Sequence, residues 1–289
     1  MKISIIGTGR MGTAFAVTLL KASRQITVWD KHIEATKVAV ENGAVLAHSF
    51  EEALENADVV LSLVSSASIG FELFKNVDKK YLSNKFVINY STALPEDGEK
   101  FNNLISENNG YYLSAAITSY PDLIGTDYTV IQYSGENSYF EKVGDLLQPL
   151  SPDATLYVGV DLQKPAVVDA AMTGSFYAVA LAGFIECAAY LNSKGYNPMD
   201  SEEFAYKAID LLKYKVKKTL QEIEKNDFST IQVGVSVYLD AVIQWRDAVQ
   251  DSGLKGTLIA ALADDLGDAL ERGNGHLAFS SQYLSAAKI

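Results

Sequence analysis

A glycine-rich turn near the start of the chain has the spacing needed to bind a phosphate group. Gly7, Gly9 and Gly12 fit the pattern G-x-G-x-x-G, between an apolar run at residues 2–6 and a run with helical spacing at residues 13–22. In this context the first glycine permits a tight turn, the second lets a pyrophosphate approach, and the third lets the helix pack on the strand. The pattern predicts a dinucleotide-binding loop, with an ordinary glycine-rich turn as the alternative.

The end of the second predicted strand carries charged residues that bear on the choice of cofactor. Asp30 lies 18 residues after Gly12, where an acid binds the adenosine ribose and favours NAD. Lys31 and His32 argue in the opposite direction, because both can meet a 2′-phosphate, and a solvated loop is a further alternative. The sequence leaves this conflict open.

Asp169 is an acid within an apolar helical run and is the strongest candidate for chemistry. Its apolar neighbours predict that it is shielded from water, which would favour the protonated form, whereas a helix start near Pro165 would favour the carboxylate. Tyr177 follows eight residues later, about 80° further around a helix, and could face the same cavity or be a packed aromatic. Glu186 is too far along the helix to be a partner carboxylate, and we expect it at an interface or in solvent.

The order of the predicted elements indicates the fold class. Strand-like and helical runs alternate up to about residue 158, which is typical of a doubly wound parallel sheet. Long helical runs then dominate. Predicted strands are residues 2–6, 25–29, 57–64, 86–89, 111–116, 128–133 and 155–158, and the long helices are residues 165–194, 201–225, 229–252 and 257–272. We therefore predict an α/β protein with a Rossmann-type domain at residues 1–160 and an all-α domain at residues 161–289.

Composition excludes several classes of protein. The 289 residues carry a net charge of −12, which disfavours nucleic acid and anionic membranes as partners. The chain has one cysteine and three histidines, so we expect no disulfide, no metal site and a reducing cytoplasm. The apolar stretch at residues 170–185 is shorter than the ~20 residues that span a membrane, and we expect a buried helix of a soluble protein.

Several segments, in their order and spacing, resemble the imine reductases and reductive aminases, relatives of the β-hydroxyacid dehydrogenases. The segments that carry the resemblance are residues 7–12, 28–32, 89–95, 121–125 and 133–135, Asp169 with its helix, and residues 273–279. The resemblance implies a long interdomain helix, here about residues 165–194, and a homodimer in which two chains exchange their helical parts around each active site. It also implies hydride transfer from NADPH to a C=N bond of a small imine, giving an amine.

The resemblance also assigns residues. Asp169 stands where the dehydrogenases have a catalytic lysine, and Tyr177 matches a tyrosine near the substrate of reductive aminases. The expected cofactor-binding residues are Gly7, Gly9, Arg10, Met11, Gly12, Asp30, Lys31, His32, Val64, Ser65, Asn89, Ser91 and Thr92. The expected substrate pocket comprises Thr92, Ile117, Met172, Phe176, Tyr238 and Gln244.

One departure from the family concerns the cofactor. The usual Asn-Arg-Thr after the second strand is Asp30-Lys31-His32 here, so we expect NADPH, with NADH possible because of Asp30. The alternative functions are a carbonyl reductase like the β-hydroxyacid dehydrogenases and a nonenzymatic NADP(H)-sensing protein.

Overall fold

The computed structural model describes residues 1–55 and 57–287. Contacts within the chain divide it into two compact units, Met1–Phe176 and Tyr177–Ile289. The predicted boundary near residue 160 follows the last strand, whereas the contact division falls inside the long helix that comes next.

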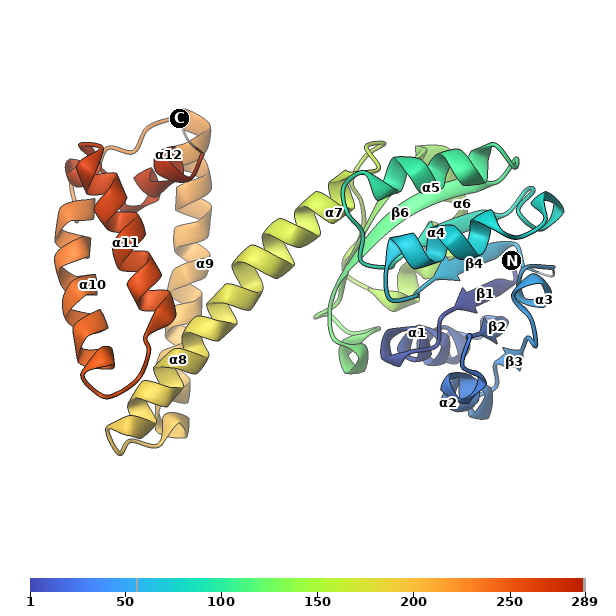
Figure 1. The fold of residues 1–289 in the computed structure, drawn as a ribbon, viewed down its shortest axis with the longest axis horizontal. Helices are drawn as coiled ribbons and strands as arrows, with labels where there is room; N and C mark the ends of the chain where they lie inside the picture. Colours follow the sequence, from blue (N-terminus) through green and yellow to red (C-terminus); the bar gives the residue numbers. More distant parts are fainter. Residues whose placement is uncertain (56, 288–289) are drawn as a thin grey trace. The chain divides into compact units, whose positions relative to one another are not determined.

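The first unit is built on an eight-stranded sheet with the order β3-β2-β1-β4-β5-β6-β7-β8 (Figure 1). Its strands are β1 (Ile3–Ile6), β2 (Ile26–Trp29), β3 (Val45–Leu46), β4 (Val59–Ser62), β5 (Phe86–Asn89), β6 (Tyr111–Thr118), β7 (Val130–Gly135) and β8 (Thr155–Tyr157). Strands β1, β4 and β5 are buried throughout, as expected for parallel strands that are covered on both faces. The α/β fold class is confirmed.

One pair of strands departs from the predicted parallel arrangement. β7 runs antiparallel to β6, with Leu113 opposite Gly135 and Thr118 opposite Val130. The connection at residues 119–129 contains only a short 3-10 turn and no α-helix that could return the chain to the other end of the sheet. An antiparallel neighbour needs no such crossover, which is the physical reason for the reversal.

Helices cover both faces of the sheet. Helices α1 (Arg10–Lys21), α2 (Lys37–Glu41) and α6 (Asn137–Leu147) contribute Phe15, Ala39 and Leu147 to one apolar cluster with Ile5 and Val28. A second cluster collects the apolar residues of α3 (Phe50–Glu55), α4 (Ala67–Lys75) and α5 (Asp97–Ser106) around Ile6 and Val87. Full burial of a Phe or Leu side chain stabilises a fold by about 1.5–3 kcal/mol, so both clusters hold the sheet firmly.

The second unit is helical and has a small core of its own. It contains α9 (Glu202–Lys225), α10 (Val235–Gln250), α11 (Thr257–Glu271) and α12 (Gln282–Ala286). Val235, Leu239 and Val242 of α10 pack against Ala263, Leu266 and Ala269 of α11. Both carboxylate oxygens of Glu186 accept hydrogen bonds from the backbone N–H of Leu258, at 3.2 and 3.3 Å. Glu186 therefore caps the start of α11. From the sequence we expect Glu186 at an interface or in solvent, and the sequence does not predict this contact within the chain.

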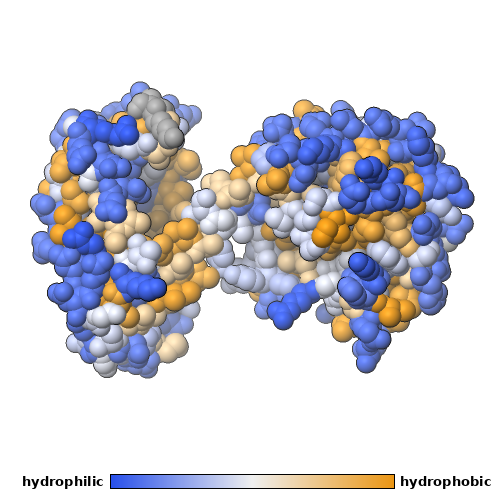
Figure 2. All heavy atoms as spheres, in the orientation of Figure 1, coloured by the Kyte–Doolittle hydropathy of each residue, from blue (hydrophilic) through white to orange (hydrophobic). Residues whose placement is uncertain are grey.

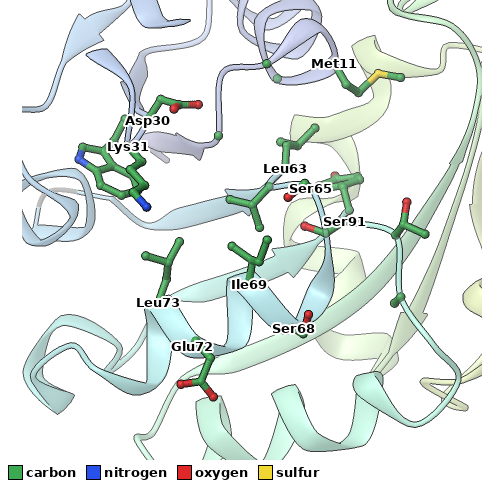
Figure 3. A pocket seen from close by; sticks show the side chains of 18 of the residues that line it. Met11, Asp30, Lys31, Leu63, Ser65, Ser68, Ile69, Glu72, Leu73 and Ser91 are labelled. Atoms are coloured by element: carbon green, nitrogen blue, oxygen red, sulfur yellow. The ribbon is translucent and has the colours of Figure 1, made fainter. Parts of the chain in front are cut away.

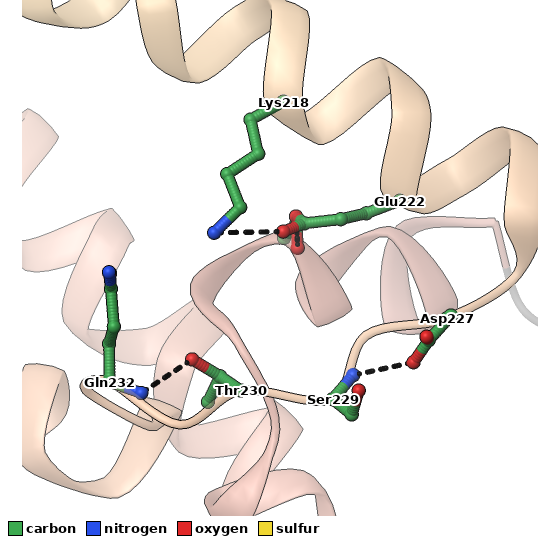
Figure 4. Close-up of polar contacts among 7 residues, drawn as sticks. Lys218, Glu222, Asp227, Ser229, Thr230 and Gln232 are labelled. Atoms are coloured by element: carbon green, nitrogen blue, oxygen red, sulfur yellow. Dashed lines mark hydrogen bonds and ion pairs between the residues drawn. The ribbon is translucent and has the colours of Figure 1, made fainter.

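Helix α10 begins later than the predicted residue 229, because side chains hold a turn there. Figure 4 shows the Asp227 carboxylate accepting from the Ser229 N–H at 3.0 Å and the Thr230 hydroxyl accepting from the Gln232 N–H at 3.0 Å. The Ser229 hydrogen bonds lower the pKa of Asp227. Such local bonds compete with helix formation. Nearby, Glu222 of α9 pairs with Lys218 at 3.5 Å.

A 30-residue helix, Lys164–Ser193, follows the sheet. It begins as α7 (Lys164–Asp169), widens to a π-helix at Ala170–Ala178, and continues as α8 (Val179–Ser193). No residue between 170 and 193 is buried within the chain, so the expected buried helix is wrong for a single chain. By length and composition this helix could cross a membrane, although the core helix of a soluble protein can meet the same criteria. The expectation that the apolar stretch is too short to span a membrane therefore does not hold for the complete helix.

Candidate active site

A cavity of about 1260 Å³ lies in the first unit, over the carboxyl ends of β1, β2, β4 and β5. This is where ligands bind in doubly wound sheets. The glycine loop after β1 forms one wall, and Gly7, Gly9 and Gly12 all line the cavity. Its size exceeds the ~300–1,000 Å³ typical of small-ligand pockets, which leaves room for an extended ligand.

The three glycines differ in what a side chain would meet. Gly7 has φ +93°, and a Cβ there would lie 2.7 Å from the Leu63 carbonyl oxygen. A Cβ on Gly12 would overlap the Gly7 carbonyl oxygen, whereas one on Gly9 would have no neighbour within 4 Å. Gly9 thus presents bare backbone to the cavity, as close approach of a pyrophosphate requires.

The start of α1 offers an anion site next to Gly9. Gly9 is the N-cap, no side chain caps the helix, and the first turn contains no acid. The first N–H groups of a helix lack partners within the helix and carry partial positive charge. Arg10 and Met11 also line the cavity here, so the residues present fit a dinucleotide phosphate.

Asp30 lies at the end of β2 and its carboxylate is fixed on both sides. Its Oδ2 accepts from the Thr8 N–H at 2.7 Å, and its Oδ1 accepts from the His32 N–H at 2.8 Å. Figure 3 shows the carboxylate directed toward the glycine loop. Lys31 and His32 also line the cavity and are exposed.

The opposite wall is formed by the turns after β4 and β5. Val64, Ser65, Ser91 and Thr92 all line the cavity, as does Ile117 of β6. Asn89 does not, because it is buried beneath the surface. Its side-chain oxygen accepts from the Ser91 N–H at 3.3 Å, so Asn89 supports the wall and does not form it.

Asp169 lines the same cavity, together with Ala166 of α7. Helix α7 packs against β6 and β7, which places the last residue of α7 beside the sheet. One turn later the Thr173 hydroxyl lies 3.1 Å from the Thr118 hydroxyl and anchors the helix to the end of β6. Asp169 is half-buried within the chain, so most of it is shielded from water, and it borders the open cavity.

The remaining expected residues are not part of this cavity. Met172 and Phe176 are exposed on the π-helix. Tyr177, Tyr238 and Gln244 belong to the second unit. There Tyr238 packs edge-on to Phe279 with ring centroids 5.0 Å apart, and Gln244 is exposed. Among the described residues, no group of three or more His, Cys, Asp or Glu could hold a metal ion.

Sequence reasoning missed several lining residues. Ile69 and Leu73 of α4 point from that helix into the pocket in Figure 3, and Trp29 and Phe50 line it from β2 and α3. The spacing of apolar residues in α4 could have predicted that this helix has an apolar face, but not that part of this face lines a ligand cavity.

Tyr90 was also missed, and it joins the wall to the core. Its hydroxyl lies 3.0 Å from the Tyr133 hydroxyl. Burial raises the pKa of Tyr90, and Tyr133 raises it further. Burial likewise raises the pKa of Tyr133. The pair is therefore neutral at ordinary pH, and it holds the strand end beneath Ser91 in place.

Comparison with known proteins agrees with this geometry. Residues 2–159 match the family model described as the NAD binding domain of 6-phosphogluconate dehydrogenase. The chain belongs to this family. Its fold also superimposes on an imine reductase from Pseudomonas sp. with a TM-score of 0.95 and 26% identity, covering 99% of each chain.

Two curated relatives extend the comparison. An NADPH-dependent reductive aminase from Aspergillus oryzae is 25% identical over 66% of this chain and 64% of its own length. The 2-hydroxy-3-oxopropionate reductase of Escherichia coli is 27% identical over 55% of each chain. The matches thus span less than two thirds of either relative. The resemblance to imine reductases and reductive aminases, and the presence of a dinucleotide-binding domain, are confirmed.

Proposed function

We propose that this chain is an NADPH-using imine reductase, which reduces the C=N bond of a small imine or iminium ion to an amine. The observation that carries the proposal is one cavity that joins a dinucleotide-type glycine loop to the carboxyl group of Asp169. The imine reductase fold of the whole chain and the NADPH-dependent reductive aminase among its relatives support it.

Different parts of the cavity take different roles in cofactor binding and in the reaction. The N–H groups at the start of α1 bind the pyrophosphate, and the turns bearing Ser65 and Ser91 form the wall beyond it. When bound, a reduced nicotinamide supplies the hydride. Asp169 either donates a proton to the nitrogen of a neutral imine or, as a carboxylate, stabilises the charge of an iminium ion. In the first case a new C–H bond and a new N–H bond replace the C=N π bond. In the second case only the C–H bond is new, and the π electrons return to nitrogen as its lone pair.

We propose that Thr92 and Ile117 contact the substrate from the cavity wall. The other expected residues lie outside this cavity, and we propose that the second copy of the homodimer supplies them, with Tyr177 orienting the substrate and Met172, Phe176, Tyr238 and Gln244 contacting it.

The central test replaces Asp169 by alanine. Removing the only acid of the α7 segment that lines the cavity should reduce turnover of a methyl-substituted pyrroline at least about 100-fold, the size of a general acid-base contribution. NADPH binding, followed by fluorescence, should stay unchanged. Asp153→Ala, at an exposed acid outside the cavity, is the matched control. Unchanged turnover in Asp169→Ala would contradict the assigned role.

We further propose a cytoplasmic homodimer in which a second copy covers the exposed apolar helices. No residue of α8 or α9 is buried within the chain, and α9 exposes Phe204, Ile209, Leu211 and Leu220 to solvent. Large exposed apolar patches mark interaction surfaces. In this proposal residues 1–160 bind the dinucleotide, and residues 161–289 supply the dimer contacts and the substrate side.

The similarity to 2-hydroxy-3-oxopropionate reductase favours a second candidate, reduction of a carbonyl group. Asp169 argues against a substrate carboxylate, because an acid offers no cation to hold it. Assays of small aldehydes and hydroxy acids beside the pyrroline distinguish the two activities. Tight cofactor binding with turnover of neither class would indicate a cofactor-sensing protein.

A further inference from the structure

Two side chains of opposite charge stand at the ribose end of the cavity. Asp30 and Lys31 are consecutive at the end of β2, and both line the cavity. In Figure 3 the Asp30 carboxylate is directed toward the glycine loop, whereas the Lys31 side chain extends toward α4. The negative charge of Asp30 and the positive charge of Lys31 are therefore directed toward different parts of the cavity.

The Asp30 carboxylate cannot turn away from a ligand without breaking two hydrogen bonds. Thr8 N–H holds one oxygen at 2.7 Å, and His32 N–H holds the other at 2.8 Å. A carboxylate has about four acceptor sites, so acceptor capacity remains for a ribose hydroxyl. The Thr8 contact spans 22 residues and ties the glycine loop to β2.

The charges around the cavity oppose an additional phosphate beside Asp30 and favour one beside Lys31. The basic side chains that line the cavity are those of Arg10, Lys31 and His32, and the acidic ones are those of Asp30, Glu51, Glu72 and Asp169. Two negative charges of a 2′-phosphate would meet the fixed Asp30 carboxylate, with Lys31 as the adjacent countercharge. A ribose hydroxyl would instead donate a hydrogen bond to Asp30.

We propose that this is a dual-cofactor site, in which Asp30 binds the ribose diol of NADH and Lys31 binds the 2′-phosphate of NADPH. The inference rests on the dinucleotide-binding part of the proposed function and deepens it. Asp30 is then the group that limits the preference for NADPH, and Lys31 is the group that creates it. Both reduced cofactors bind the same cavity with comparable affinity.

The test measures dissociation constants for NADPH and NADH by fluorescence without any imine substrate. The wild-type constants should agree within about 10-fold, which corresponds to 1.4 kcal/mol. Asp30→Asn should shift the ratio of the two constants toward NADPH by about 10-fold or more, and Lys31→Ala should shift it toward NADH by a similar factor. Higher salt should weaken NADPH binding more than NADH binding in the wild type, and this difference should shrink in Lys31→Ala.

The controls are Glu34→Gln and Lys37→Ala, which alter the same net charges at exposed residues outside the cavity. They should leave the ratio unchanged. Because Asp30→Asn also loses one bond to the backbone, both affinities can fall together, and the ratio is therefore the readout. A ratio unmoved in both test variants, or a wild type with more than about 100-fold preference for one cofactor, overturns the proposal. Absence of imine reduction with intact binding contradicts only the proposed activity.

Discussion

At the scale of single residues, two glycines of the loop have different roles: Gly12 is needed for folding and Gly9 for ligand binding. A Cβ on Gly12 would collide with the Gly7 carbonyl oxygen, whereas one on Gly9 would enter open space. The two positions look equivalent in the sequence pattern. Their surroundings show that Gly12 serves helix–strand packing, and that Gly9 keeps the cavity floor free of a side chain.

The pair Gly9→Ala and Gly12→Ala tests this division. Gly9→Ala should keep the wild-type melting temperature but weaken NADPH binding by about 10-fold or more, because the new methyl group stands where the ligand approaches. Gly12→Ala should lower the free energy of unfolding by about 1–3 kcal/mol, the usual cost of overpacking. Thermal unfolding and fluorescence titration check both. A destabilised Gly9→Ala protein with normal binding would contradict the division.

At the scale of elements, the chain directly after β5 is linked to β7 through two buried tyrosines, Tyr90 and Tyr133, of which Tyr90 lines the cavity. The Tyr90 and Tyr133 hydroxyls lie 3.0 Å apart, and the rings meet edge-on with centroids 5.9 Å apart. The pair therefore connects the strand end that carries Ser91 to the antiparallel part of the sheet.

Tyr133→Phe should cost about 1–3 kcal/mol of unfolding free energy, because it leaves the buried Tyr90 hydroxyl without that partner. The double variant Tyr90→Phe, Tyr133→Phe should recover part of this loss, since no unpaired hydroxyl remains. Chemical denaturation of the three proteins measures the effect. Equal stability of the single variant and the wild type would show that the hydrogen bond contributes nothing.

The same pair predicts the response to alkaline pH. Burial raises the folded-state pKa of each tyrosine above its ordinary value of 10.0, so the folded state holds these protons more tightly than the unfolded state. Their contribution to stability is fully present below about pH 10 and is lost as pH rises toward the folded-state values. The double phenylalanine variant should lose less stability than the wild type between about pH 10 and pH 12. Identical pH profiles would contradict this assignment.

At the scale of the whole molecule, the exposed apolar helices are the main property that a single chain leaves unexplained. Phe204 is 79% exposed and Ile209 is 60% exposed, and both lie on α9, which buries no residue. Figure 2 shows hydrophobic residues at the surface of the helical part of the chain. Water contact of this extent is unfavourable by roughly 25 cal/mol per Å² of apolar surface.

Phe204→Glu with Ile209→Glu should convert the proposed dimer to a monomer, because two charges would have to be buried in an apolar interface. Light scattering after size-exclusion chromatography measures the mass. Lys213→Glu, at an exposed position of the same helix that is already charged, is the control. A wild-type protein that is monomeric at micromolar concentration would contradict the dimer, and detergent-dependent solubility would favour a membrane role for residues 164–193.

The sequence by itself determined the features that are local in the chain. The spacing of Gly7, Gly9 and Gly12 between a strand and a helix identified the loop, because the positive φ of Gly7 and the close contact of Gly12 with the Gly7 carbonyl both arise within the loop itself. Apolar periodicity likewise located most strands and the long helices. It missed β3, which has only two residues, and α5, whose apolar side is limited to a few positions such as Phe101 and Ile105.

Only the tertiary structure decided the features that depend on distant partners. It reversed β7, tied Asp30 to Thr8, and placed Asn89 beneath the wall and not within it. It also brought Asp169 into the cavity of the glycine loop, more than 150 residues away in the chain. Periodicity indicates which face of an element is apolar, but it does not indicate which residues pack against that face, because this packing depends on the order and direction of all the strands in the sheet.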